Sequence, residues 1–184
     1  MSDAPRLLVV NADDFGFRLS IDRAILRAAE HGIVTSASVI PTGDSLAAVT
    51  NLADAGIGIG VHLTTVAGGA PLLPASEVPT LVDREGRFPL TWRALVARCV
   101  RGALDPADLD REWSAQIEAV RAHGVAITHV DTHQNVHLWP AIADVTVDLA
   151  RRYGIGVVRV PRTAGHGPFA GGVRHLSRGV VRRA

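Results

Sequence analysis

The 184-residue sequence is poor in several residue types, and each shortage excludes a class of protein. Its single cysteine, Cys99, cannot form a disulfide within the chain, which excludes a disulfide-stapled fold. Basic and acidic residues nearly cancel to a net charge of +1, so no strong overall field attracts nucleic acid or an anionic membrane. Any charged partner must therefore be recognised locally.

Long hydrophobic runs are also missing near the N-terminus. The apolar run at residues 7–10 stops at Asn11, which is far shorter than a membrane helix, and no small-residue cleavage site follows it. We therefore expect a soluble, cytoplasmic protein with no membrane or nucleic-acid partner. A length of 184 residues with 47% hydrophobic content suits one domain, residues 1–184, with one well-buried core.

The sequence does contain a repeated alternation of helical and strand patterns. Four times, apolar residues at helical spacing end at a glycine that precedes a β-branched run; these glycines are Gly32, Gly56, Gly124 and Gly154. Glycine readily takes the left-handed conformation that caps a helix C-terminus. Apolar residues three or four positions apart give each helix one apolar face, which is suited to covering a sheet.

Five largely apolar runs are expected to be strands; they span residues 7–10, 36–40, 57–63, 125–130 and 156–160. Such runs suit parallel strands that are buried on both faces. Asp105 before Pro106 marks the start of one helix by capping it. The sequence therefore predicts an α/β fold in which the loops that follow the strands gather on one face, where folds of this kind carry their chemistry.

One segment, at about residues 64–104, interrupts the alternation with several prolines and a helical stretch at 92–101. Two interpretations stay open. The segment is either a lid or wall of a substrate site, or a surface excursion without such a role.

Two adjacent carboxylates, Asp13 and Asp14, follow the first apolar run. Adjacent strand residues point in opposite directions, so only a turn could bring both side chains to one site. Gly16 permits such a turn. Two carboxylates in one site repel each other unless a cation lies between them. The pattern predicts a metal ligand beside a general base.

Histidines follow two further strand patterns. His62 ends the third run, and on its own a histidine there is more often a packing residue. The fourth run is followed by a dense polar segment that contains His129, Asp131, His133 and His137. His129 and Asp131 alternate with Val130 and should share a face of the strand. A mixed set of carboxylate and imidazole ligands leaves room for water and substrate, which is typical of catalytic metal sites in hydrolases.

Three motifs resemble the YdjC/ChbG family of carbohydrate deacetylases. They are Asn-Ala-Asp-Asp-Phe-Gly at 11–16, Gly-Val-His-Leu at 60–63 and Thr-His-Val-Asp-Thr-His-Gln-Asn-Val-His at 128–137. Residues 31–38, 69–72 and 158–161 also resemble family segments, so the likeness covers nearly the whole chain to residue 162.

The resemblance implies a distorted (β/α) barrel related to polysaccharide deacetylases. It also implies removal of acetyl groups from N-acetylated sugars, such as chito-oligosaccharides, with a divalent metal ion, zinc or magnesium. By this likeness Asp14, His62 and His133 bind the metal, and Asp13 is the base that takes a proton from the attacking water. His137 is the candidate acid that protonates the leaving amine.

The sequence departs from the family pattern at two points. Asn135 stands where many members carry another histidine. The chain also ends after five readable strands, too few to close a barrel of this type. The fold is then an incomplete barrel, a barrel completed by a partner, for which a homo-oligomer is one option, or the product of a truncated gene.

The basic tail at residues 166–184 carries several arginines among apolar residues. One interpretation is an amphipathic helix that binds anionic lipid or nucleic acid. The interpretation that we favour is the end of a helix whose remaining barrel contacts are missing.

Two other functions remain open. A metal-dependent phosphoesterase also uses Asp and His clusters at strand ends, although a two-metal site would need more ligands than the sequence offers. A catalytically inactive sugar-binding or interaction protein would retain the metal site without turnover.

Overall fold

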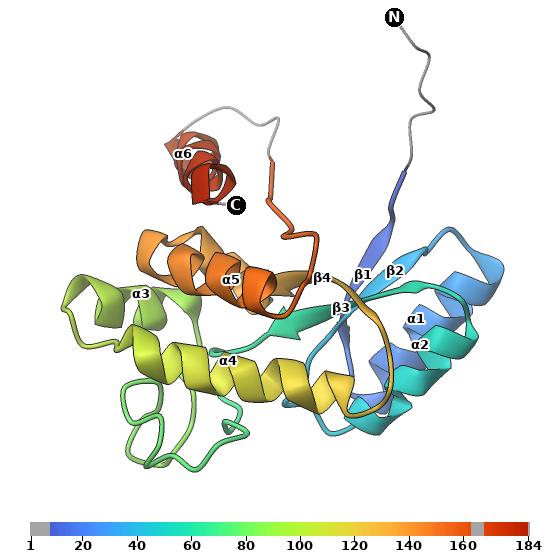
Figure 1. The fold of residues 1–184 in the computed structure, drawn as a ribbon, viewed down its shortest axis with the longest axis horizontal. Coiled ribbons are helices and arrows are strands. Elements are labelled where there is room, and N and C mark those ends of the chain that lie inside the picture. Colours follow the sequence, from blue (N-terminus) through green and yellow to red (C-terminus); the bar gives the residue numbers. More distant parts are fainter. Residues whose placement is uncertain (1–7, 163–167, 184) are drawn as a thin grey trace, which may run out of the picture.

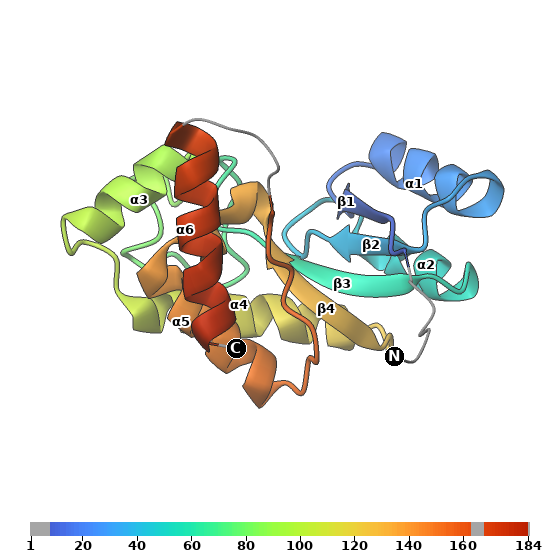
Figure 2. The same ribbon diagram turned by 90° about the horizontal axis from the view of Figure 1, so that it is seen from above.

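The computed structural model describes residues 8–162 and 168–183 (Figure 1). Four parallel strands form one sheet, in the order β1 (Asn11–Phe15), β2 (Ser36–Val39), β3 (Gly58–Leu63) and β4 (Ile127–Thr132). The order in space equals the order in the chain, as in a (β/α) barrel, and Figure 2 shows the four strands side by side. The predicted α/β fold with an incomplete barrel is confirmed, and the homo-oligomer stays a prediction.

Helices cover the sheet and extend away from it (Figure 1). Two of them, α1 (Leu19–His31) and α2 (Thr50–Asp54), lie beside β1 to β3, and α2 follows the short helix η1 (Leu46–Val49). Further along the chain, α4 (Pro106–Arg121) packs against β3 and against α5 (Pro140–Arg152). The remaining elements are α3 (Trp92–Val100), η2 (His133–Leu138) and α6 (Pro168–Arg183). Asp105 caps α4 as predicted, because its Oδ1 accepts a hydrogen bond of 2.9 Å from the amide of Ala107.

The two faces of the sheet differ in chemistry. The face under the helices is apolar and belongs to the main core; it carries Ala37, Val39, Ile59, Val61, Leu63 and Val130. The opposite face carries polar side chains that hydrogen bond to one another, among them Ser38, His62 and Asp131. The prediction of strands with two apolar faces was therefore wrong for this polar face, which holds the candidate site.

The first strand begins later than predicted. Residues 8–10 are not strand, and Leu8 and Val9 are 79% and 68% exposed, whereas residue 7 lies outside the described ranges. The cause is position, because β1 is at the edge of the sheet and, among residues 8–10, Val10 alone bonds to the neighbouring segment. Its carbonyl accepts from the amides of Thr35 and Ser36, and its amide donates to the hydroxyl of Thr35. The two carboxylates consequently lie within β1 rather than after it.

Two other local predictions were also wrong. The expected strand at 156–160 is reduced to one parallel bridge between Val158 and Val130 of β4. Gly56, Gly124 and Gly154 have positive φ as predicted, but Gly32 has φ −125°. At Gly32 the reason for glycine is space, because a Cβ atom there would lie 2.7 Å from the carbonyl oxygen of Ala28.

The segment at 64–104 is fastened to the core by buried side chains of α4. Glu112 is fully buried, and its carboxylate accepts hydrogen bonds of 3.0 and 3.1 Å from the amides of Leu72 and Leu73. Gln116 pairs with both the amide and the carbonyl of Thr64. Val66, Val78, Leu81, Phe88 and Leu95 of the segment are buried in the main core. Its role as a lid or wall stays a prediction, but it is a packed part of the fold.

We expect Glu112→Gln to destabilise the protein by roughly 1–3 kcal/mol, because the new NH2 group replaces one of the two oxygens and places a donor against the backbone amide that donates to that oxygen. Chemical denaturation measures this free energy of unfolding, and proteolysis within 64–104 should accelerate with it. Glu118→Gln on the exposed side of the same helix is the matched control. Equal stability of the two variants would contradict the fastening role of Glu112.

The described part of the basic tail forms α6, which crosses α5 (Figure 2). Val180 is buried in a second apolar cluster with Leu138, Ala143 and Val147. The apolar face of α6 is thus packed within the protein. None of the helices in the described ranges is long and apolar enough to cross a membrane.

Candidate metal centre

An irregularity in β1 brings its two carboxylates toward the same end of the sheet. The pairing of β1 with β2 shifts register between Ala12 and Phe15. Asp14 has φ 70°, a left-handed conformation that is strained for a residue with a side chain. Gly16 has φ 88°, so a second left-handed residue completes the turn. The turn that the sequence required at this point is present.

The two histidines of the predicted ligand set come from β3 and from the end of β4. His62 is the fifth residue of β3 and is 4% exposed. His133 directly follows β4 and opens η2, in which Gln134 and Asn135 both have positive φ. Non-glycine residues with positive φ collect at functional sites, because the surrounding structure must hold them there.

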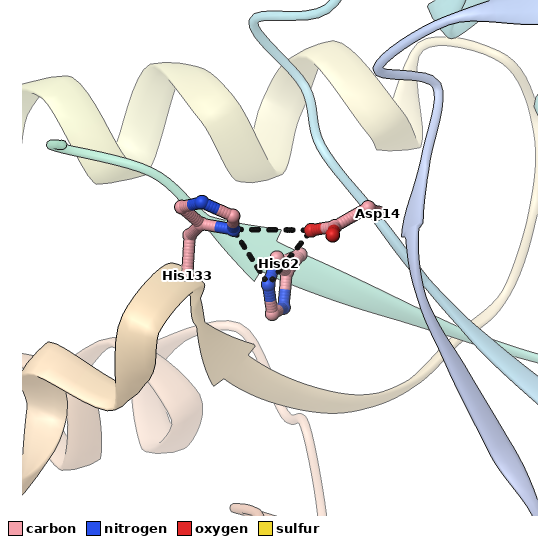
Figure 3. Close-up of side chains that lie close together, drawn as sticks. All are labelled: Asp14, His62 and His133. Atoms are coloured by element: carbon pink, nitrogen blue, oxygen red, sulfur yellow. Dashed lines mark hydrogen bonds and ion pairs between the residues drawn. The ribbon is translucent and has the colours of Figure 1, made fainter. Parts of the chain in front are cut away.

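Asp14, His62 and His133 converge (Figure 3). Oδ1 of Asp14 lies 3.0 Å from Nδ1 of His133 and 3.4 Å from Nε2 of His62, and the two histidine nitrogens are 3.3 Å apart. The rings stand edge to face, with an interplanar angle of 82°. Three residues that are distant in the sequence thus offer three ligand atoms to one point.

The spacing of these three atoms fits a divalent ion. Zinc bonds of about 2.0–2.1 Å in tetrahedral geometry separate the ligand atoms by roughly 3.3–3.4 Å. The observed separations of 3.0–3.4 Å therefore need little adjustment to hold an ion. A hydrogen bond from His133 lowers the pKa of Asp14, which keeps this carboxyl group ionised as a ligand.

His62 is held from behind by a buried carboxylate. Its Nδ1 lies 2.7 Å from Oδ1 of Asp131, so Nε2 faces the other two ligand atoms. Burial lowers the pKa of His62, but the hydrogen bond and charge of Asp131 outweigh it and the pKa is raised. For Asp131, burial alone would raise the pKa. The hydrogen bonds and charges of His62 and Arg159 outweigh this effect and lower the pKa to about 2. A carboxylate behind a metal-binding histidine fixes its tautomer and orientation.

We expect Asp131→Asn to weaken metal binding by roughly 10- to 100-fold, because the ring of His62 loses the carboxylate that orients it. Titration of the metal-free protein with Zn²⁺ measures the affinity. Asp148→Asn, on the exposed surface of α5, is the control. An unchanged affinity in Asp131→Asn would show that His62 is oriented by its packing alone.

Asp13 lies near His62 and Asp131, because one ligand atom of each of the three residues lies within 4.8 Å of the others. Its Oδ1 accepts hydrogen bonds from Asn11, at 2.8 Å, and from Arg159, at 2.5 Å. The side chain is 38% exposed, and its Oδ2 makes no hydrogen bond to the described residues. Asp13 is thus oriented through one oxygen while the other can face a substrate. Its role as base stays a prediction.

The structure does not bring His137 into the cluster. The residue is fully buried, its Nδ1 lies 2.6 Å from the hydroxyl of Thr132, and its Nε2 lies 2.8 Å from the carbonyl oxygen of Arg159. Burial lowers the pKa of His137 to about 4, so the ring is neutral at pH 7. Its predicted role as acid is untested, and these contacts give it a structural role between η2 and residue 159.

Sequence reasoning did not assign roles to Asp131, Ser38 or Arg159 at the site. Asp131 was visible as part of the dense polar segment, and the alternation with His129 correctly placed both on one face. That shared face is where the hydroxyl of Ser38 contacts Asp131 and His129, at 3.0 Å each. Gly60 allows this contact, since a Cβ atom there would lie 2.1 Å from the His129 ring.

A family model described as YdjC-like protein matches residues 7–183. The chain belongs to the YdjC-like family. The family expected from the sequence motifs is therefore confirmed.

Several similar proteins are named carbohydrate deacetylases. The protein from Geobacillus stearothermophilus is 36% identical over 162 residues, which are 87% of this chain and 62% of the relative. The protein from Brevibacillus brevis is 34% identical over 152 residues, which cover 82% and 58%. The chain thus spans about three fifths of the length of these relatives.

A solved structure supports the fold. It is a putative cellobiose-phosphate cleavage protein from Enterococcus faecalis V583, with 30% sequence identity and a TM-score of 0.74. The likeness covers 94% of this chain and 64% of that chain. The YdjC-like fold is therefore present over nearly the whole sequence.

Proposed function

We propose that this chain removes acetyl groups from N-acetylated sugars with one divalent ion, zinc or magnesium, held by Asp14, His62 and His133. The observation that carries the proposal is the convergence of these three side chains, with ligand atoms 3.0–3.4 Å apart. The names of the YdjC-like relatives support the acetylated sugar as substrate.

A divalent ion supplies a Lewis acid that polarises the amide carbonyl and makes water more acidic. The residues of the chain do the rest. Asp14 contributes one negative charge to the ligand set, and Asp131 behind His62 adds electron density to the ring. His133 is 21% exposed, so the ligand set opens on a side that a sugar can reach.

Asp13 moves the proton in the proposed reaction. Its Oδ2 takes a proton from water as the water oxygen bonds to the acetyl carbon. When the bond between carbon and nitrogen breaks, the same proton can pass to the leaving amine, so the products are acetate and a free amino sugar. One residue can carry both steps, because His137 is buried away from the cluster.

The test is an acetate-release screen over N-acetylglucosamine and its oligomers, run with the protein loaded with Zn²⁺ or Mg²⁺. Acetate released only in the presence of metal is the expected result. Metal bound without acetate from any substrate would instead support an inactive sugar-binding protein. The screen covers chain lengths from one to several sugars, because the name carbohydrate deacetylase is common to all of these lengths.

A second candidate is cleavage of a sugar phosphate, because the solved relative is named as a putative cellobiose-phosphate cleavage protein; a phosphoesterase would break the phosphate ester of such a substrate. Disaccharide phosphates belong in the same screen with phosphate release as the readout. Phosphate released while acetylated sugars stay inert would replace the deacetylase proposal with this one.

A further inference from the structure

Two tryptophans line one cavity of about 370 Å³, which lies where α3, η2 and α6 meet. Trp92 begins α3, and Trp139 directly follows η2. Both α3 and α6 contact η2, and Figure 2 shows α6 beside α3. Small-molecule sites usually have volumes of about 300–1,000 Å³, so this cavity is large enough for a ligand. Its walls also include Gln134, Asn135, Val173 and Leu176, and we call it the tryptophan cavity.

The tryptophan cavity lies next to the candidate metal centre along the chain. Gln134 and Asn135 are the two residues that follow the proposed ligand His133. Consecutive Cα atoms are about 3.8 Å apart, so the lining begins one such step from His133. Residues 161–162, which follow Arg159 after one intervening residue, line the cavity as well. Two segments that leave the site therefore form part of its wall.

The lining combines a stacking surface with polar groups. Trp92 is 41% exposed, although tryptophan is on average a well-buried residue. The guanidinium carbon of Arg93 lies over one face of this ring, 5.3 Å from its centre, so a ligand in the cavity would stack on the other face. Gln134 and Asn135 are exposed and offer amide groups. A sugar ring has an apolar face of C–H groups and an edge of hydroxyl groups, and this lining can contact both.

We propose that the tryptophan cavity binds a sugar ring next to the acetylated one, so that the preferred substrate is an oligosaccharide rather than a single sugar. The inference rests on the proposed deacetylase function and adds to it the place of the neighbouring ring. With the acetylated ring at the metal centre, the chain of sugars passes His133 and its next ring stacks on Trp92. The segment at 64–104 then supplies one wall of the substrate site.

Hydrogen bonds and packing hold Trp92 in place beside the metal centre. The side-chain oxygen of Gln134 accepts a hydrogen bond of 2.8 Å from the amide of Trp92, which ties the start of α3 to the residue after His133. Thr91 caps the same helix, and Leu95 one turn further on is fully buried. A stacking surface that is fixed before the sugar arrives costs little conformational entropy when the sugar binds.

The experiment compares the trimer of N-acetylglucosamine with the monomer. The wild type loaded with Zn²⁺ should have a kcat/KM roughly tenfold or more higher for the trimer, because contacts with a remote ring add to transition-state binding. Trp92→Ala should lower this preference by roughly 3- to 10-fold, the usual effect of one aromatic contact, and Trp92→Phe should restore most of it. Val173→Phe fills the cavity from α6 and should lower the preference without removing an aromatic ring. Val100→Ala, exposed at the end of α3, is the control.

Binding without turnover separates this inference from the proposed function. Asp13→Asn lacks the proposed base, so calorimetric titration of this variant, loaded with Zn²⁺, measures the affinity for each sugar. Adding Trp92→Ala should weaken trimer binding by roughly 3- to 10-fold. If no sugar released acetate, the proposed function would fail, whereas trimer binding that depends on Trp92 would still support the cavity.

Three results would overturn the inference while acetate release from the monomer left the metal centre intact. The first is an equal kcat/KM for trimer and monomer in the wild type. The second is an unchanged preference in both Trp92→Ala and Val173→Phe, with wild-type circular dichroism. The third is trimer binding no tighter than monomer binding in Asp13→Asn.

Discussion

His62→Ala is expected to lose the metal ion and to lower acetate release by roughly a thousandfold or more, which corresponds to the loss of several kcal/mol of transition-state stabilisation. The reason is geometric. Nε2 of His62 lies within 3.4 Å of both other ligand atoms, and the ring is buried in the floor of the site. Metal content by elemental analysis and acetate release, measured on the same sample, check the prediction.

A surface histidine provides the control for this variant. His31→Ala, at the exposed end of α1, should keep both the metal ion and the activity. Full metal content in His62→Ala would remove His62 from the ligand set and would leave Asp14 and His133 as an incomplete pair.

Asp13→Asn is expected to keep the metal ion and to lower kcat by roughly 10²- to 10⁴-fold, the usual contribution of a general base. The amide can still accept the hydrogen bond from Arg159 through its oxygen, but it cannot take a proton from water. The measurement is kcat at saturating substrate, normalised to bound metal. A lower kcat at unchanged metal content distinguishes a general base from a metal ligand.

Asp54→Asn at the end of α2 is the matched control, because Asp54 is exposed and is not among the residues that could hold the metal ion. A loss of metal in Asp13→Asn would instead make Asp13 a ligand. An unchanged kcat would assign the proton transfer to another group, and His133 would be the next residue to test.

The order of helices and strands could be predicted because the sequence patterns that indicate them are local. Apolar spacing and capping residues depend on a few neighbouring positions, and they identified α1, α4, α5 and three of the four strands. The ligand set was predictable for a related reason. Strands in a parallel sheet end on one side, so motifs at the carboxyl ends of β1, β3 and β4 must meet there. The family motifs then assigned individual roles.

The part of the site that could not be predicted depends on contacts between distant segments. Arg159 follows a short apolar run that pairs with β4 at a single bridge, and nothing local in the sequence shows that its side chain reaches Asp13. The edge position of β1 could not be predicted either, because the exposure of Leu8 and Val9 depends on which strand lies beside them. Both facts require the three-dimensional arrangement.

His137 shows that residue type alone does not predict a catalytic role. A histidine next to a metal-binding motif suggests acid–base chemistry, yet the number of hydrogen bonds already made by its ring decides what it can do. Both ring nitrogens of His137 have partners within the chain, so its contribution is to join η2 to residue 159.

The short pairing of residues 157–159 with β4 also bears on local stability. A segment held by so few backbone hydrogen bonds opens more readily than a full strand, and hydrogen exchange detects such openings. The amide of Arg159 should therefore exchange faster than amides within β3. Each opening would withdraw the guanidinium from the carboxylates of Asp13 and Asp131, so the site would briefly hold two negative charges without this positive partner.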